Sequence, residues 1–184
     1  MKQASPTPGP MKCMTAASLI LTAAFLWAWR RYDAAWLLSM AITFGTIAYH
    51  LLMRLAVGGI FHTFMGNRAD CSKKWYRLHS WETPLYDTLR VKTWKGRLPT
   101  YDPDLFSPKK HSWDEIAQAM CQAELVHETN MLLSFVPLLA APKLGAFGVF
   151  LSTSVAAALF DSLFVMMQRY NRPRVLRLAA KTRR

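Results

Sequence analysis

Cysteine, acidic residues and the common catalytic loop motifs are scarce or absent in this sequence of 184 residues. The three cysteines, Cys13, Cys71 and Cys121, have spacings that match neither a metal site nor a disulfide framework. No Gly-x-Ser-x-Gly motif supports serine-nucleophile chemistry, and both a phosphate-binding glycine-rich loop and a dinucleotide fingerprint are missing. The chain has only 11 acidic residues but 23 Lys and Arg residues, which gives a net charge of +12. A chain this basic could bind nucleic acid or an anionic membrane surface.

Apolar residues are abundant and make up 52% of the chain. They are gathered into long runs with the charged residues outside them, which is typical of an integral membrane protein. We therefore predict an all-α membrane protein with four transmembrane helices. The predicted spans are residues 12–29, 34–57, 122–141 and 144–168. The predicted domains are a disordered tail over residues 1–11, a single membrane domain over 12–176 and a basic tail over 177–184.

The distribution of Lys and Arg predicts the orientation of these spans, because cytoplasmic loops carry an excess of positive charge. Four spans place both termini and the segment 58–121 on one side of the membrane. All but four of the 23 Lys and Arg residues belong to these parts, the exceptions being Arg30, Arg31, Arg54 and Lys143. We therefore expect a multi-pass protein of the cell membrane with both termini and residues 58–121 in the cytoplasm.

The segment 58–121 is too aromatic for a simple linker. Its Trp and Tyr rings are interleaved with Lys and Arg, a mixture that suits the headgroup layer of a membrane. The segment could anchor the protein at this interface or help to bind a substrate, and the sequence leaves both readings open. No nucleic-acid partner is expected, because no binding module is recognisable and the topology already explains the charge.

Three ionisable residues, Glu124, His127 and Glu128, stand at the edge of the third apolar run. They share one face of a helix whose start carries a capping box, formed by Ser112 and Glu115. Ionisable groups are costly at the edge of a membrane, so they indicate a functional site. A carboxylate beside an imidazole can tune it for proton transfer, and we expect His127 to act as a general base that Glu124 orients.

Asp161 and His50 fall at a similar depth in the fourth and second spans. The alternative to a catalytic pocket is a polar network that only locks the helices together. The third span also contains one Glu-x-x-His pair, a motif of metal sites in helical bundles, and His50, His62 and Glu128 could add ligands. Those metal sites use a second such pair, which this chain lacks, so we expect no metal.

The fourth span ends in the run Gln168-Arg169-Tyr170-Asn171-Arg172-Pro173-Arg174. Arginines at an inner helix end could clamp phosphate, because a guanidinium forms two parallel hydrogen bonds to it. A stop signal for membrane insertion would explain the charge but not the Tyr-Asn pair. We therefore predict that this run binds the phosphates of a substrate or a lipid headgroup.

These motifs resemble those of the glycosyl-4,4'-diaponeurosporenoate acyltransferase family. The resemblance covers about Trp75 to Leu176 and is most specific in the arginine-rich run described above. Its other matching segments are Ala123 to His127, Val91 to Pro99 with its Trp-Lys and Leu-Pro pairs, and Phe106 to Lys110. This chain has Glu128 where the family commonly has Trp, and Asp161 is more acidic than the residues of the family at that place.

The resemblance implies an enzyme, a small membrane acyltransferase; the family is named for an acceptor that is a glycosylated carotenoid, and the acceptor of this chain stays open. The implied reaction moves a fatty acyl group from an acyl thioester, such as acyl-CoA, to a hydroxyl of a lipid-linked acceptor, and it needs no further cofactor. We expect His127 and Glu124 to be catalytic. The expected substrate-binding residues are Glu128, Asp161, Trp94, Lys95, Arg169, Tyr170, Asn171, Arg172 and Arg174.

The expected partners are a membrane lipid, the acyl donor and the lipid-linked acceptor, and a homo-oligomer is compatible with the sequence. Two other functions remain open. A lipid methyltransferase or a membrane reductase would also place polar helix ends beside a cytosolic cofactor. A non-enzymatic lipid-binding or adaptor protein would use Glu124 and His127 for stability alone.

Overall fold

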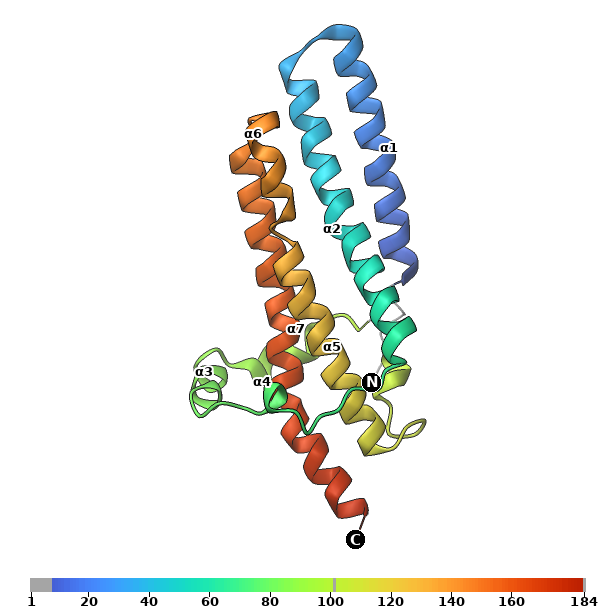
Figure 1. Ribbon diagram of the computed structural model, residues 1–184, viewed down its shortest axis with the longest axis vertical. Coiled ribbons are helices and arrows are strands. Elements are labelled where there is room, and N and C mark those ends of the chain that lie inside the picture. Colours follow the sequence, from blue (N-terminus) through green and yellow to red (C-terminus); the bar gives the residue numbers. More distant parts are fainter. Residues whose placement is uncertain (1–7, 101, 184) are drawn as a thin grey trace. The chain divides into compact units, whose positions relative to one another are not determined.

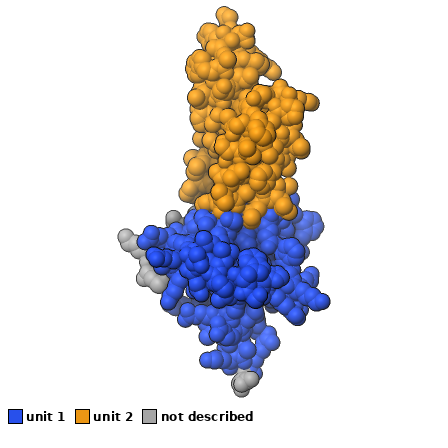
Figure 2. All heavy atoms as spheres, turned by 90° about the vertical axis from the view of Figure 1, so that its left-hand side faces the viewer, with its two compact units in different colours: residues 1–7, 58–129, 161–184 blue, residues 8–57, 130–160 orange. Residues whose placement is uncertain are grey.

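The computed structural model describes residues 8–100 and 102–183, and all regular secondary structure in these residues is helical, as predicted. The α-helices are α1 Pro8–Tyr32, α2 Ala35–Met65, α3 Glu82–Thr88, α4 Val91–Trp94, α5 Trp113–Leu133, α6 Ala141–Leu144 and α7 Phe147–Thr182 (Figure 1). Short 3-10 helices cover Lys74–Tyr76, Lys95–Arg97, Pro103–Phe106 and Val136–Ala140. The chain divides into two compact units (Figure 2). Unit 1 contains residues 58–129 and 161–184, and unit 2 contains residues 8–57 and 130–160.

Within the described residues, three helices are long and apolar enough to cross a membrane. These are α1 from Gly9, α2 and α7, which match the predicted first, second and fourth spans. Each is longer than predicted, because α2 continues past Val57 to Met65 and α7 continues through Pro173 to Thr182. Large apolar side chains of α1, such as Ile20 and Trp27, are 68% exposed, as expected for a surface that faces lipid.

The ends of the chain differ from the predicted tails. Residues 1–7 of the predicted disordered tail lie outside the described residues, whereas residues 8–11 form the first turn of α1. Most of the predicted basic tail continues α7 as far as Thr182. Helix formation costs little here because the sequence around Leu178 consists largely of good helix formers.

In unit 2, α1 and α2 form an antiparallel hairpin (Figure 1). Asp33 makes the turn with a positive φ of 48°, and its amide bonds the carbonyl of Trp29 at 2.8 Å. Phe25 stacks on Phe44 across the hairpin, with ring centroids 5.6 Å apart. The turn thus falls in residues 30–33, which the predicted first and second spans left as their connection.

The predicted third span is not one continuous helix. Helix α5 ends at Leu133, and the chain continues as the 3-10 helix Val136–Ala140 and the short α6. Pro137 has no N–H to continue the α-helical pattern, which explains the break. The carbonyl of Leu133 therefore receives no hydrogen bond from residue 137. It accepts one from the Tyr49 hydroxyl instead, at 2.8 Å. The turn into α7 then lies at Gly145, whose φ of +67° suits glycine, rather than at the predicted Pro142 and Lys143.

Helix α5 begins with the predicted capping box. The backbone N–H of Ser112 donates to the Glu115 carboxylate at 2.8 Å, and the N–H of Glu115 donates to the Ser112 hydroxyl at 3.3 Å. This pairing satisfies N–H groups that have no partner within the helix. The capping box therefore fixes where α5 starts, and so fixes the register of the polar residues further along it.

A small apolar core lies inside unit 1, where Ala69, Tyr76 and Cys121 are buried and Leu125 packs against them. A disulfide joins Cys71 to Cys121, with 6.1 Å between their Cα atoms. The spacing of the cysteines in the sequence did not indicate this pairing. Their separation of 50 residues carries no sequence signal, and only the fold brings the loop after α2 against α5.

Candidate functional site

Arg169 of α7 is the centre of a buried ion network in unit 1. Its Nε and Nη2 donate to the Glu82 carboxylate at 2.7 and 2.6 Å, and its Nη1 donates to Glu124 at 2.5 Å. Nη1 also donates to the carbonyl of Trp75 at 3.2 Å, and Nη2 to that of Arg77 at 2.9 Å. A guanidinium has five N–H donors, and these five bonds occupy all of them.

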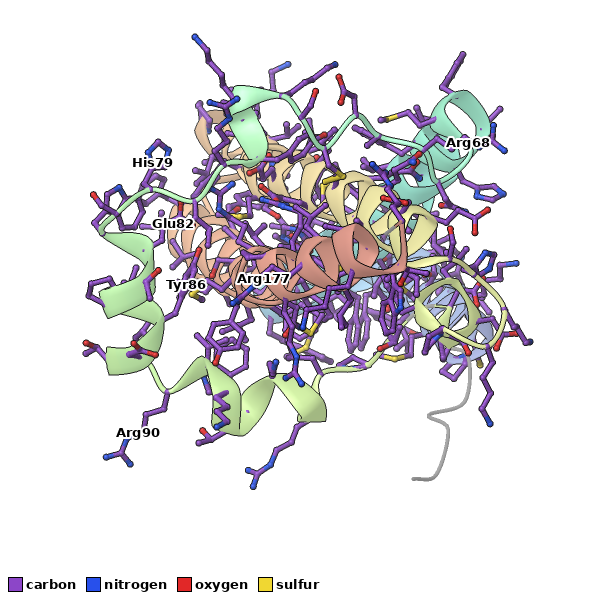
Figure 3. The ribbon with its side chains drawn as sticks, turned by 90° about the horizontal axis from the view of Figure 1, so that it is seen from below. Arg68, His79, Glu82, Tyr86, Arg90 and Arg177 are labelled. Atoms are coloured by element: carbon purple, nitrogen blue, oxygen red, sulfur yellow. A yellow bond between two sulfur atoms is a disulfide. The ribbon has the colours of Figure 1, made fainter. Side chains whose placement is uncertain are left out.

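Glu82 of α3 is the partner of Arg169 that sequence reasoning did not single out. It is 1% exposed, and both of its oxygens accept hydrogen bonds. Besides the two bonds from Arg169, it accepts the Tyr86 hydroxyl at 2.5 Å and the His79 backbone N–H at 2.9 Å. Figure 3 shows Glu82 and Tyr86 pointing from α3 toward α7. Helix α3, although only two turns long, is therefore fixed to α7 by a fully hydrogen-bonded carboxylate.

Glu124 of α5 completes the network and is fully buried. Its two oxygens accept one bond from Arg169 and a short one from Arg172. Arg172, which is 2% exposed, also donates to the carbonyl of Tyr76 and lies over the Tyr76 ring at 5.2 Å. Two carboxylates thus balance two guanidiniums, and the network joins α5, α7 and the segment before α3 with little net charge.

This geometry favours structural roles for three of the residues predicted to act in catalysis or substrate binding. Arg169 and Arg172 were predicted to clamp phosphate, but both are buried and hydrogen-bonded to carboxylates or carbonyls. Glu124 was predicted to orient His127, but the arginines hold its carboxylate. The physical reason is that a buried guanidinium needs a carboxylate nearby, and such a pair is stronger than a contact with a neutral imidazole. Arg174, the remaining arginine of the run, is exposed.

His127 contacts a different carboxylate. Its Nδ1 lies 2.8 Å from Oδ1 of Asp161 on α7, and the Asp161 side chain is 1% exposed. The imidazole stacks on Phe164 with centroids 4.5 Å apart and an interplanar angle of 9°. The His127 side chain is 22% exposed, so it can still be reached. An imidazole held this way donates Nδ1–H to the carboxylate and presents Nε2 as a base.

A second group of predicted residues gathers around Lys95. Its Nζ donates to the side-chain oxygen of Asn171 and lies 4.6 Å from the centroid of the Tyr170 ring. Burial lowers the pKa of Lys95, and the nearby Arg174 and Lys92 lower it further. The effect of these neighbours on Lys95 indicates a concentration of positive charge that an anion would stabilise. We refer to Lys92, Lys95 and Arg174 as the cationic cluster.

The remaining predicted residues lie near these groups. The Trp94 indole donates to the carbonyl of Leu89 at 3.0 Å, at the end of α3. Glu128 accepts the Trp75 indole N–H at 2.8 Å. His50, the other polar group expected at this depth, belongs to unit 2, whereas the residues described above belong to unit 1. In the part of the chain that the structure describes, no group of three or more His, Cys, Asp or Glu side chains could hold a metal ion.

Sequence reasoning did not identify Glu82, Tyr86 or Phe164 as site residues, because their roles depend on contacts between segments that are distant in the sequence. One signal was available for the first two: they stand four residues apart, so they share a helix face. Phe164 gave no such signal, since an apolar ring in a transmembrane run is expected to face lipid or pack against a helix.

The stability of unit 1 should depend on pH through Glu82. Burial raises the pKa of this carboxyl, but hydrogen bonds from Arg169, the His79 amide and Tyr86 outweigh burial and lower the pKa from 4.5 to about 2. Because the pKa of Glu82 is lower in the folded protein than in the unfolded chain, the ionised carboxylate stabilises the fold at pH values above the unfolded pKa. This contribution is lost as the pH falls from about 4.5 toward 2. We expect thermal unfolding in detergent to follow this dependence, and Glu82→Gln to be less stable at neutral pH with a flatter profile. Equal slopes for wild type and variant would contradict it.

The fold and the site define the class of protein: a multi-helix membrane protein with a histidine–aspartate pair and a buried ion network in its polar unit. A family model then identifies it further. The model for glycosyl-4,4'-diaponeurosporenoate acyltransferase matches residues 72–181, and the chain belongs to this family. The matched region includes every residue of the ion network and of the histidine–aspartate pair. Neither a curated protein nor a solved structure matches the sequence.

Proposed function

We propose that this protein transfers a fatty acyl group from an acyl thioester to a hydroxyl of a lipid-linked, glycosylated acceptor. The family is named for acyl transfer to a glycosylated carotenoid acid, which supports the reaction class. The observation that carries the proposal is the 2.8 Å contact between His127 Nδ1 and Asp161 in a partly exposed position. Transfer to a hydroxyl needs a base, and this imidazole is oriented to be one.

In the proposed mechanism His127 Nε2 removes the proton of the acceptor hydroxyl as the oxygen attacks the thioester carbonyl. The C–O bond of the new ester forms and the C–S bond breaks. The imidazolium then returns its proton to the leaving thiolate, so the products are an ester and a free thiol. Asp161 holds the ring in the tautomer that leaves Nε2 unprotonated and stabilises the imidazolium while it exists. Stacking on Phe164 fixes the plane of the ring.

The donor of this reaction would bind through the cationic cluster. An acyl thioester of coenzyme A carries several phosphate charges. Lys95 donates to a neutral amide oxygen rather than to a carboxylate, and Arg174 is exposed. Tyr170 and Asn171 position the Lys95 ammonium, which accounts for the Tyr-Asn pair between the arginines. Arg169 and Arg172 would act on the donor only indirectly, by holding α7 in place.

Neutralising the cluster should weaken donor binding more than catalysis. We expect Lys95→Ala and Arg174→Ala each to raise the KM for acyl-CoA about three- to tenfold with kcat nearly unchanged, because each removes one phosphate contact of about 1 kcal/mol. Arg177→Ala, an exposed arginine one turn further along α7, is the matched control. A loss in kcat alone, or an equal effect of Arg177→Ala, would contradict this assignment.

The proposed topology retains four crossings. Glu82, in the segment that follows α2, binds Arg169 in the second half of α7, which supports a topology with this part of α7 and the segment after α2 on one side of the membrane. A chain that leaves α2 on this side and enters α7 from the other must cross once more between them. The apolar half of α5, the 3-10 helix Val136–Ala140 and α6 would make this broken crossing. The excess of Lys and Arg places the shared side in the cytoplasm.

Lipid mass spectrometry tests the function directly. Cells that express the wild type or His127→Ala are supplied with isotope-labelled fatty acid, and their lipids are compared. A labelled ester that depends on the wild type supports acyl transfer, and its mass identifies the acceptor. Identical lipidomes in a host that makes glycosylated carotenoids, with both proteins present in the membrane, would contradict the proposal and favour an adaptor role.

A further inference from the structure

A pocket of about 320 Å³ opens in unit 1 beside the ion network. It is lined by Lys74, Trp75, His79, Glu128 and Arg169. Its volume is at the lower end of the range for small-molecule sites. None of the roles described so far uses Lys74, the Trp75 ring or the His79 side chain.

The groups that the pocket offers to a ligand differ from those of a phosphate site. Arg169 has no donor left, because its five N–H groups are bonded within the network. Glu128 uses one oxygen to accept the Trp75 indole N–H at 2.8 Å, and a carboxylate has capacity for further bonds at the other. A carboxylate in the wall repels an anion but accepts well from hydroxyl groups.

Trp75 supplies the flat surface of this pocket. Its side chain is 63% exposed although the hydrogen bond to Glu128 fixes its orientation. The negative face of an indole attracts the polarised C–H groups on one side of a pyranose ring. His79 and Lys74 at the rim can donate to ring hydroxyls, while Glu128 accepts from them. An aromatic face beside a carboxylate and donor groups therefore fits a neutral sugar better than it fits a phosphate or an acyl chain.

The pocket and the proposed base involve neighbouring positions of one helix. Glu128 follows His127 directly on α5, and successive side chains of an α-helix point about 100° apart. We infer that the Trp75–Glu128 pocket binds the glycosyl headgroup of the acceptor. This inference rests on the proposed function and extends it by assigning the acceptor subsite.

Equilibrium binding tests the pocket without any catalytic turnover. Purified protein in a detergent that carries no sugar is titrated with methyl β-D-glucopyranoside, and binding is followed by saturation-transfer NMR. We expect Trp75→Ala and Glu128→Gln to weaken binding about tenfold or more. Trp27→Ala is the matched control, since this indole is 68% exposed and belongs to unit 2. Inorganic phosphate is the competing probe.

The outcomes separate the pocket from the function. Glucoside binding that is lost in Trp75→Ala but kept in Trp27→Ala and His127→Ala supports the inference, even if the wild type then transfers no acyl group. No glucoside binding by the wild type, equal binding by Trp75→Ala, or competition by phosphate would overturn it. Where acyl transfer is active, Trp75→Ala should raise the KM for the acceptor and leave that for the donor unchanged, and an unchanged acceptor KM would also overturn it.

Discussion

Replacing His127 with Ala is expected to lower kcat for acyl transfer about 10²- to 10⁴-fold, the usual contribution of a general base. Asp161→Asn should cause a loss of similar order while the fold is kept, because an amide favours the wrong tautomer of the imidazole and no longer stabilises its cation. Both effects should appear in kcat rather than in the KM of either substrate, since neither group is assigned to binding. Steady-state kinetics on purified protein measure them.

His62→Ala is the matched control for this experiment. His62 is an exposed histidine near the end of α2, and it was considered above only as an additional metal ligand. It should keep wild-type rates. Full activity of a folded His127→Ala protein would exclude the proposed base, and a large loss in His62→Ala would revive the metal alternative.

Removing Glu124 is expected to destabilise the protein by about 3–5 kcal/mol, because it leaves two buried guanidiniums without their shared carboxylate. The conservative change Glu124→Gln should cost less than Glu124→Ala but more than a surface substitution, since it keeps the shape and removes the charge. Thermal unfolding in detergent and resistance to proteolysis between α2 and α5 are the two readouts.

The control for Glu124 is an ion pair of good geometry that is exposed. Asp114 accepts two hydrogen bonds from Arg183, at 2.6 and 2.9 Å, but the Arg183 side chain is 71% exposed. Asp114→Asn should therefore change stability by less than about 1 kcal/mol. If Glu124→Ala were no more destabilising than Asp114→Asn, the buried network would not hold unit 1 together.

The long helices and the polar face of α5 could be predicted because each depends on local sequence. Apolar runs indicated α1, α2 and α7, and the capping box at Ser112 marked the start of α5. The exact ends were less predictable, because α2 continues beyond its apolar run and α7 continues through Pro173. The break before Pro137 could have been placed from the missing proline N–H, but the span was predicted as continuous over residues 122–141.

The partners of the polar residues could not be predicted in the same way. Glu124, His127 and Asp161 were all recognised as candidate site residues, yet which carboxylate contacts the imidazole depends on where the two arginines lie. Glu82 takes part in this choice from a segment more than forty residues away in sequence from Glu124. The disulfide between Cys71 and Cys121 was missed for the same reason, since only packing brings the two cysteines together.

Asp161 is assigned to catalysis and Glu124 to structure, and one measurement compares the two carboxylates directly. Acyl-transfer activity per folded molecule is determined for Asp161→Asn and Glu124→Gln in the same detergent and lipid mixture. We predict that Asp161→Asn is well folded but slow, whereas Glu124→Gln yields less folded protein whose remaining molecules work at nearly the wild-type rate. A folded but inactive Glu124→Gln together with a fully active Asp161→Asn would contradict the account.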